Sequence, residues 1–215
     1  MKINVAARAS NLSKVQFQEV VDLLAMHHPH VELVPTFVET RGDLDKTSSL
    51  RTLDKTDFFT REIDAMVRDQ VCRLAIHSAK DLPDPLPSFL KIVALTKGID
   101  SSDSLVVRQG ESLPMGGVVA TSSLRREQNV RAWRADVTFV DIRGTIEERL
   151  HQLDEGLVDG VVIAEAGLIR LKLDHRMRFK LEGETTPNQG RLAVVAHATD
   201  GEMTELLGVL GEVVA

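Results

Sequence analysis

A dense set of reactive side chains follows the short apolar run at residues 74–76, in the order His77-Ser78-Ala79-Lys80-Asp81. The apolar run predicts a buried strand, and Pro83 excludes a long regular helix directly after it. In open α/β folds, ligand chemistry lies at strand ends of this kind. An ionised Asp81 would stabilise a cationic intermediate or transfer protons, and His77 would serve as a base. The alternatives are an Asp81 that only forms a turn and a His77 that is hydrogen-bonded in the core.

A second group of candidate residues lies in the segment 120–126, which reads Ala-Thr-Ser-Ser-Leu-Arg-Arg. An apolar strand ends here in hydroxyl side chains and a helix begins, which offers free N–H groups and a favourable dipole to an anion. Arg125 and Arg126 add guanidinium groups that bind carboxylates through paired hydrogen bonds. The competing interpretation is a serine N-cap followed by two solvated arginines.

A similar junction of strand and helix occurs around Gly144. Arg143 stands at the junction, Gly144 permits close approach of the backbone, and Arg149 lies near the helix start. The pattern Thr145-x-x-Glu148 predicts a capping box at that start. Taken alone, the motif favours a surface ion pair between Arg149 and an acid four residues away.

The last predicted strand end of this kind, after residues 160–164, contains the small residues Ala166 and Gly167, which leave room for a ligand, and then Arg170. If the arginines at the strand ends line one cleft, the ligand carries many carboxylates or phosphates; these arginines are Arg8, Arg125, Arg126, Arg143, Arg149 and Arg170. Asp81 is the only acid that we expect within this set, and the cations should lower its pKa unless desolvation outweighs them. Neither glycine-rich nucleotide motif occurs, so nucleotide binding is not supported.

Composition narrows the class of protein. The chain has 215 residues, 43% of them hydrophobic, which is enough for a substantial core. A net charge of −6 and an aromatic content of 4% argue against a nucleic-acid partner. Cys72 is the only cysteine, which excludes a disulfide framework and a cysteine zinc site, and we expect no metal. Without a signal peptide or a long apolar run, the sequence predicts a cytoplasmic protein with no membrane partner.

Strand and helix patterns alternate along the chain, which predicts an α/β fold with mixed, mostly parallel sheets. Polar segments at 96–102 and 182–188 interrupt this alternation, and we interpret them as two crossings between lobes. The predicted first lobe contains residues 1–95 and 190–215, the second contains residues 96–189, and a cleft between them would hold a charged small molecule. Residues 39–55 are polar, lack periodicity and predict a mobile loop.

Several of these motifs together resemble the porphobilinogen deaminase family, also called hydroxymethylbilane synthases. The motifs are His77–Pro83, Ala120–Arg126, Ile142–Thr145 and Ala166–Leu171, with Arg8–Ser10 and Asn188–Gly190 in the same order. The resemblance implies two lobes like those of type II periplasmic binding proteins. It also implies the condensation of four porphobilinogen units with loss of ammonia, in haem biosynthesis, on a dipyrromethane cofactor that serves as primer. The expected partners are porphobilinogen and the oligopyrrole chain, bound by a monomer.

The resemblance also implies roles for individual residues. Asp81 would be the catalytic carboxylate, which contacts pyrrole nitrogens and helps to protonate the leaving amine. The residues expected to bind cofactor and substrate are Arg8, Ser10, Lys80, Thr121, Ser122, Ser123, Arg125, Arg126, Arg143, Gly144, Arg149, Ala166, Gly167 and Arg170. Acetate and propionate groups on each pyrrole match this set of arginines.

The sequence departs from the family pattern in three places. The family's third domain, which bears the cysteine that holds the cofactor, is not expected in this chain, and Cys72 is interpreted as a small buried or edge residue rather than a substitute. Residues 53–59 lack the family's glycine-lysine-glycine pattern, and Arg191 and Val195 replace small and acidic residues. The chain is therefore interpreted as part of a longer protein, as a short form with a non-covalent primer, or as a degenerate member that binds oligopyrroles or another polycarboxylate without turnover. A Schiff-base enzyme that uses Lys80 is a further, weaker hypothesis.

Overall fold

The computed structural model describes residues 1–49, 51 and 57–214, and their contacts divide into two compact units. Unit 1 comprises the described residues of Met1–Leu44, Lys55–Ile99 and Arg191–Ala215. Unit 2 comprises those of Asp45–Asp54 and Asp100–Gly190. Unit 2 thus includes the described residues of Asp45–Asp54, a segment that the sequence predicts in the first lobe. The other two passages, at 99/100 and 190/191, lie a few residues beyond the predicted lobe boundaries.

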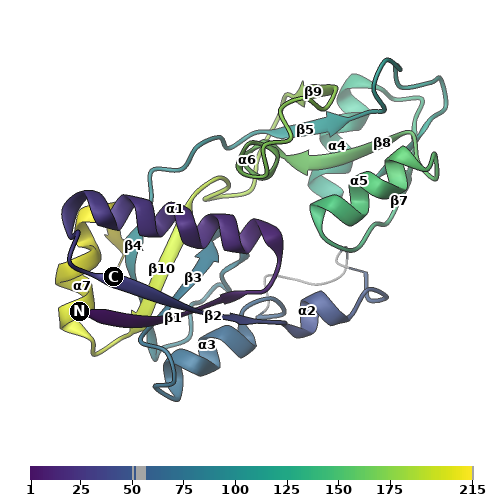
Figure 1. Cartoon of the computed structure of the whole chain (residues 1–215). Coiled ribbons are helices and arrows are strands. Elements are labelled where there is room, and N and C mark those ends of the chain that lie inside the picture. The colour runs from purple at the N-terminus through teal and green to yellow at the C-terminus, as the bar shows by residue number, and fades with distance from the viewer. Residues whose placement is uncertain (50, 52–56, 215) are drawn as a thin grey trace. The chain divides into compact units, whose positions relative to one another are not determined.

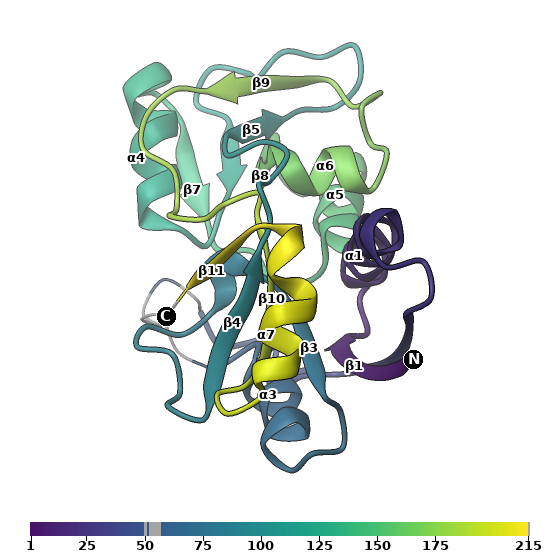
Figure 2. The ribbon, with the colours of Figure 1, turned by 90° about the vertical axis from the view of Figure 1, so that its left-hand side faces the viewer.

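Unit 1 is built on a sheet in which β10 lies between β4 and β3 (Figure 2). The strand order is β11-β4-β10-β3-β1-β2, with β1 at Lys2–Arg8, β2 at Glu32–Val38, β3 at Leu74–Ser78, β4 at Leu90–Leu95, β10 at Leu192–His197 and β11 at Glu212–Val214. Continuous apolar runs form the central strands β3 and β10, because helices cover both of their faces.

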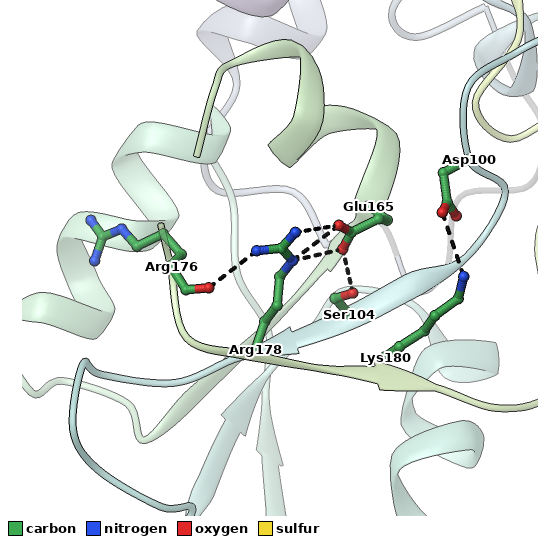
Figure 3. A pocket seen from close by; sticks show the side chains of 6 residues that line it. All are labelled: Asp100, Ser104, Glu165, Arg176, Arg178 and Lys180. Atoms are coloured by element: carbon green, nitrogen blue, oxygen red, sulfur yellow. Dashed lines mark hydrogen bonds and ion pairs between the residues drawn. The ribbon is translucent and has the colours of Figure 1, made fainter. Parts of the chain in front are cut away.

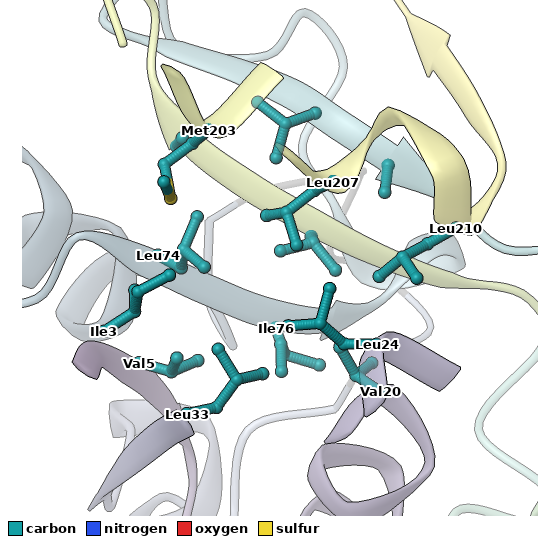
Figure 4. Packing of buried hydrophobic residues seen from close by; sticks show 14 of the residues in the cluster. Ile3, Val5, Val20, Leu24, Leu33, Leu74, Ile76, Met203, Leu207 and Leu210 are labelled. Atoms are coloured by element: carbon teal, nitrogen blue, oxygen red, sulfur yellow. The ribbon is translucent and has the colours of Figure 1, made fainter. Parts of the chain in front are cut away.

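Helices cover the two faces of this sheet as three layers (Figure 1). On one face, α1 (Asn11–His27) and α7 (Gly201–Leu207), which continues into the 3₁₀ turn η3 (Gly208–Leu210), bury Leu24 and Leu207 against Ile76 (Figure 4). On the other face, α3 (Arg61–Arg68) buries Ile63 and Val67 against alternate residues of the same strands.

Unit 2 contains a second sheet, in the order β7-β6-β8-β5-β9. Its strands are β5 at Asp103–Val106, β6 at Val118–Ala120, β7 at Thr138–Val140, β8 at Gly160–Ala164 and β9 at Arg178–Leu181. One face packs against α4 (Leu124–Trp133), and the other packs against α5 (Ile146–Asp154) and α6 (Glu165–Arg170). The predicted α/β fold with two mixed sheets is thus confirmed.

The expected predominance of parallel pairing is wrong. Parallel pairs join β1 to β2 and β3, and β6 to β7 and β8, where a helical connection returns the chain to the same edge. In contrast, β10 runs antiparallel to β3 and β4, and β5 runs antiparallel to β8 and β9. The physical reason is that β5 and β10 directly follow the two passages between units, so no helical crossover sets their direction.

The interpretation of 39–55 as a mobile loop needs correction for the described residues. Residues Arg41–Leu44 form the short helix α2, and Gly42 lies so close to Phe59 that a Cβ atom would come within 2.3 Å of its ring. Asp45 accepts backbone hydrogen bonds from Thr47 and Ser48. Residues 50 and 52–56 lie outside the described residues.

Within the described part of the chain, no helix is both long and apolar enough to cross a membrane.

Candidate active site

Asp81 lies in a short 3₁₀ turn, η2 (Ala79–Asp81), directly after β3 in unit 1. Two contacts hold this turn: Gln16 of α1 donates a hydrogen bond to Ser78 Oγ (2.8 Å), and the Ala79 N–H donates to the Arg191 carbonyl (3.0 Å). The Asp81 side chain is half-buried, and no described residue forms a hydrogen bond or ion pair with its carboxylate. Hydrogen bonds therefore fix the backbone of the turn, whereas the Asp81 carboxylate itself remains unbonded among the described residues.

Arg8 is the last residue of β1, which is the neighbour of β3 in the sheet, and Ser10 follows two residues later. Ser10 is the N-cap of α1 and accepts a hydrogen bond from the Ser13 N–H (3.2 Å). Arg8 forms an ion pair with Asp43 of α2 and lies 4.6 Å from the centre of the Phe59 ring. Burial alone would raise the pKa of Asp43, but hydrogen bonds and charge from Arg8 outweigh it and hold that pKa below its ordinary value.

His77 and Cys72 are both inaccessible in unit 1. The His77 ring lies 3.1 Å from the carboxylate of Asp64 on α3, and their side chains are only 2% and 4% exposed. Cys72 is 1% exposed within the cluster around Ile63 and Val67, which agrees with the buried role expected from the sequence. Neither side chain can meet a ligand in this state.

The hydroxyl residues of unit 2 hold the end of β6 against the end of β7. Thr121 is buried, and its hydroxyl accepts a hydrogen bond from the Ser123 N–H (3.3 Å). Ser122 Oγ accepts from the Ile142 N–H (3.1 Å) and donates to the Ile142 carbonyl. Ser123 is the N-cap of α4. These side chains shape the start of α4, where the first N–H groups have no partner within the helix.

Arg125 and Arg126 both contact one buried carboxylate, that of Asp103. Arg126 donates to one Asp103 oxygen through Nε (3.0 Å) and Nη2 (2.7 Å), and Arg125 Nη2 donates to the other (2.7 Å). Gln189 Nε2 also donates to Asp103 (3.0 Å). Burial would raise the pKa of Asp103, but the two guanidinium groups outweigh it and lower that pKa. The expectation that Asp81 is the only acid within the arginine set is therefore wrong.

The junction around Gly144 has the predicted capping box. Thr145 Oγ1 accepts from the Glu148 N–H (3.3 Å), and Glu148 accepts from the Thr145 N–H (2.8 Å). Gly144 has φ = 101°, a left-handed conformation that favours glycine, and a Cβ atom there would lie 2.5 Å from Glu148. Arg149 Nε donates to the Gly144 carbonyl (2.9 Å), and Arg143 Nη2 donates to the Asp45 carbonyl (2.7 Å). Arg149 thus lies at the helix start, as the spacing predicted.

Arg170 is more buried than its predicted role requires. It is 8% exposed and donates a hydrogen bond to the Gly190 carbonyl (3.0 Å) at the end of unit 2. Ala166 and Gly167 are buried in the same short helix, α6. The Arg170 hydrogen bond connects α6 to the segment that leaves unit 2.

The structure also shows residues that sequence reasoning missed. Asp103, Gln189 and Asp43 each orient a candidate arginine or its partner. Gln189 was visible in the Asn188–Gly190 motif, but nothing in the sequence around Asp103 distinguishes it from other acids. The departure noted at 53–59 falls mainly on residues outside the described part of the chain.

The donor set fits a dipyrromethane with its acetate and propionate groups. Guanidinium groups of unit 2 lie beside the start of α4, and this combination of forks and free N–H groups binds carboxylates. The buried thiol of Cys72 offers no point of covalent attachment. Among the described residues, no group of three or more His, Cys, Asp or Glu side chains is placed to bind a metal ion.

A separate charged pocket of about 340 Å³ lies in unit 2 (Figure 3). Glu165 accepts hydrogen bonds there from Ser104 (2.6 Å) and Arg178 (2.6–3.0 Å), and Lys180 pairs with Asp100 (3.4 Å). Arg176, the third base of the lining, pairs with Asp154 outside it (2.6 Å). Each base of the pocket is thus already paired with an acid, whereas a polycarboxylate requires unpaired positive charge.

Comparison with known proteins agrees with the motifs. Residues 3–205 match the family model described as porphobilinogen deaminase, dipyromethane cofactor binding domain. A porphobilinogen deaminase of Roseiflexus sp. (strain RS-1) is 38% identical over 97% of this chain and 71% of its own length. A probable porphobilinogen deaminase of Chlamydia pneumoniae is 39% identical over 95% of this chain and 88% of its own length.

Solved structures support the fold. The VFT2 domain of Bordetella pertussis BvgS has a TM-score of 0.54 at 14% identity, covering 97% of this chain and 86% of that domain. A periplasmic binding protein of an arginine transport system from Legionella pneumophila has a TM-score of 0.51 at 11% identity, covering 96% and 90%. These two similarities show the two-lobe fold of type II periplasmic binding proteins. The family match and the sequence relatives show that the chain belongs to the porphobilinogen deaminase family and carries its dipyrromethane cofactor-binding domain.

Proposed function

We propose that this chain is a hydroxymethylbilane synthase, which condenses four porphobilinogen units in steps and releases ammonia in each, with Asp81 as the catalytic carboxylate. The observation that carries the proposal is the state of Asp81. Its carboxylate is half-buried, has no described partner and follows the central strand β3, whereas Asp43 and Asp103 are engaged by arginines. A carboxylate that has no partner among the described residues remains able to interact with a ligand.

The proposed chemistry asks two things of Asp81. In each condensation the C–N bond of the aminomethyl group breaks, and the nitrogen leaves as ammonia after it takes up a proton. A carboxyl group within hydrogen-bond distance delivers that proton, and the resulting carboxylate stabilises the positive charge that develops on the pyrrole. Effects of this kind contribute roughly 10²–10⁴-fold to a rate. The neighbouring Lys80 would bind a carboxylate of the substrate.

Dipyrromethane supplies the pyrrole to which the first substrate unit is joined. The proposed role of the unit 2 residues is to hold its acetate and propionate groups through Arg125, Arg126 and the start of α4. We also propose Arg8, Ser10, Thr121, Ser122, Ser123, Arg143, Gly144, Arg149, Ala166, Gly167 and Arg170 as parts of the binding surface. Ser122 and Ser123 would act through the backbone that they hold, because their hydroxyl groups already have protein partners.

The proposal is tested by incubating the purified chain with porphobilinogen, with and without added dipyrromethane, and measuring ammonia and oxidised porphyrin absorbance. We expect four molecules of ammonia for each tetrapyrrole formed. An absence of ammonia even with added dipyrromethane would contradict the proposal.

A second candidate is a binding protein that holds an oligopyrrole or another polycarboxylate without turnover. It is favoured by the burial of Cys72, which leaves the chain's only thiol unable to anchor a primer. Tight binding of a dipyrromethane together with no ammonia release would support this candidate over the enzyme. Intact mass of the purified protein adds a direct measure of any attached dipyrromethane.

A further inference from the structure

We propose that Asp103 is a positioning residue, which fixes the guanidinium groups of Arg125 and Arg126 in the orientation that ligand carboxylates require. The identity of the ligand rests on the proposed function, whereas the arrangement of the three side chains does not. Four donor contacts converge on the Asp103 carboxylate: two from Arg126, one from Arg125 and one from Gln189. These contacts restrict the movement of the Asp103 carboxylate and of the two guanidinium groups that bind it.

The strand direction explains how Asp103 reaches these arginines. Asp103 is the first residue of β5 and pairs with Ala164, the last residue of the antiparallel strand β8. It therefore lies at the edge of the sheet where β6 and β8 end and where α4 begins. In a parallel arrangement the start of β5 would lie at the opposite edge, away from Arg125 and Arg126.

Exposure separates the inner carboxylate from the outer arginines. The Asp103 side chain is 1% exposed, whereas the side chains of Arg125 and Arg126 are 22% and 13% exposed. A ligand therefore has access to part of each arginine side chain, whereas the Asp103 carboxylate that holds the two guanidinium groups is inaccessible. Ordering a long side chain on binding costs roughly 0.5–1.5 kcal/mol, and prior ordering of both arginines avoids that loss.

Further hydrogen bonds connect Arg125 and Gln189 to the segments at the two ends of unit 2. Arg125 donates to the Glu184 carbonyl and to Thr186 Oγ1 (3.2 Å), and Gln189 donates to the Ser101 and Ser102 carbonyls (2.7 and 3.1 Å). The segments that enter and leave unit 2 are thus joined at the base of the arginine pair. Movement of either segment would be transmitted to the arginines.

Charge and orientation predict opposite effects when Asp103 is neutralised. The three side chains together carry a charge of +1, and Asp103→Asn would raise it to +2. If Asp103 acted only as a competing negative charge, the variant would bind an anionic ligand more tightly. If Asp103 positions the arginines, the variant binds more weakly despite its greater positive charge.

The test is calorimetric titration of the full chain with a synthetic dipyrromethane that bears two acetates and two propionates, after intact mass has shown how much is already bound. We expect Asp103→Asn to weaken binding about 10-fold, a loss that ordering two side chains accounts for. Asp103→Glu keeps the charge but displaces the carboxylate, and we expect it to weaken binding as well. Asp159→Asn is the matched control, because Asp159 also pairs with an arginine (3.3 Å) but precedes β8 at the opposite edge of the sheet.

A purely structural role would lower the melting temperature of the variants without changing affinity once the folded fraction is accounted for, and that result would overturn the proposal. Tighter binding by Asp103→Asn would also overturn it. Should both variants fail to fold, NMR of the arginine Nε–H groups in the unaltered chain decides: the Arg126 signal should persist when ligand binds. Its loss would mean that the ligand displaces Asp103. Ligand binding without ammonia release would contradict the proposed enzyme alone, whereas no binding by the unaltered chain would overturn both proposals.

Discussion

Asp81 in unit 1 and Asp103 in unit 2 both lie where strands of their sheet meet polar turns, but their surroundings differ. The Asp81 carboxylate is half-buried and has no described partner. The Asp103 carboxylate is 1% exposed and receives hydrogen bonds from two arginines and Gln189. This difference suits the two carboxylates to different tasks. A carboxylate that exchanges protons with a ligand, as proposed for Asp81, needs oxygens without protein partners. A carboxylate that orients cations, as proposed for Asp103, needs hydrogen bonds to those cations.

The largest expected effect is the loss of rate when Asp81 is replaced. Asp81→Asn removes the proton donor and the negative charge but no described internal contact. We expect the rate of ammonia release to fall by roughly 10³-fold, within the range typical of general acid–base groups, while the melting temperature stays within about 1 °C. Stopped-time ammonia assays and thermal unfolding provide the two measurements.

A nearby control separates this effect from a general change of charge. Asp84 is exposed and lies three residues beyond Asp81 in the same connection. Asp84→Asn should leave the rate within a factor of two. Equal losses in both variants would contradict the special position of Asp81.

Replacing Asp103, whose carboxylate is fully hydrogen-bonded, should instead mainly lower the free energy of unfolding. Asp103→Asn leaves two partly buried guanidinium groups without their counter-charge, and breaking a buried pair in this way costs roughly 3–5 kcal/mol. Urea unfolding followed by the fluorescence of Trp133 would measure this cost. A loss below about 1 kcal/mol would place Asp103 among ordinary surface ion pairs and remove the contrast with Asp81.

The pH dependence of stability sharpens the same contrast. Burial opposes ionisation of Asp103, but Arg126 and Arg125 outweigh it, so its pKa is lower in the folded chain than in the unfolded chain. Its contribution to stability is therefore present above the unfolded pKa of about 4 and is lost as the pH falls through the lower folded pKa. We expect the unfolding free energies of the unaltered chain and Asp103→Asn to converge as the pH falls from 5 to 2. Parallel curves over that range would contradict this assignment.

Sequence patterns predicted one side of this comparison better than the other. The apolar run before His77 and the proline after Asp81 located a strand end, and the family motif selected Asp81 there. Asp103 escaped notice because its position depends on the antiparallel direction of β5, which no local pattern encodes. Under the expected parallel pairing, the start of β5 would have been placed away from Arg125.

The same reasoning explains the other differences. Local signals succeeded for the capping box at Thr145 and for the burial of Cys72, because short-range spacing and residue type determine both. The pairing of Arg8 with Asp43 depends on α2, which is only four residues long and has no hydrophobic period to reveal it. Contacts between distant segments thus account for most of what the sequence did not reveal.

The smallest expected effect compares the backbones that support the two carboxylates. Ser122 Oγ makes two hydrogen bonds with Ile142 and joins the ends of β6 and β7, whereas Ser78 Oγ receives one bond from Gln16. At about 1 kcal/mol for each net hydrogen bond, Ser122→Ala should cost about 2 kcal/mol and Ser78→Ala about 1 kcal/mol. Paired urea titrations measure both. If Ser78→Ala instead proves the more costly, the turn after β3 is held more tightly than the junction between β6 and β7. In that case Asp81 differs from Asp103 in the partners of its side chain and not in the rigidity of its backbone.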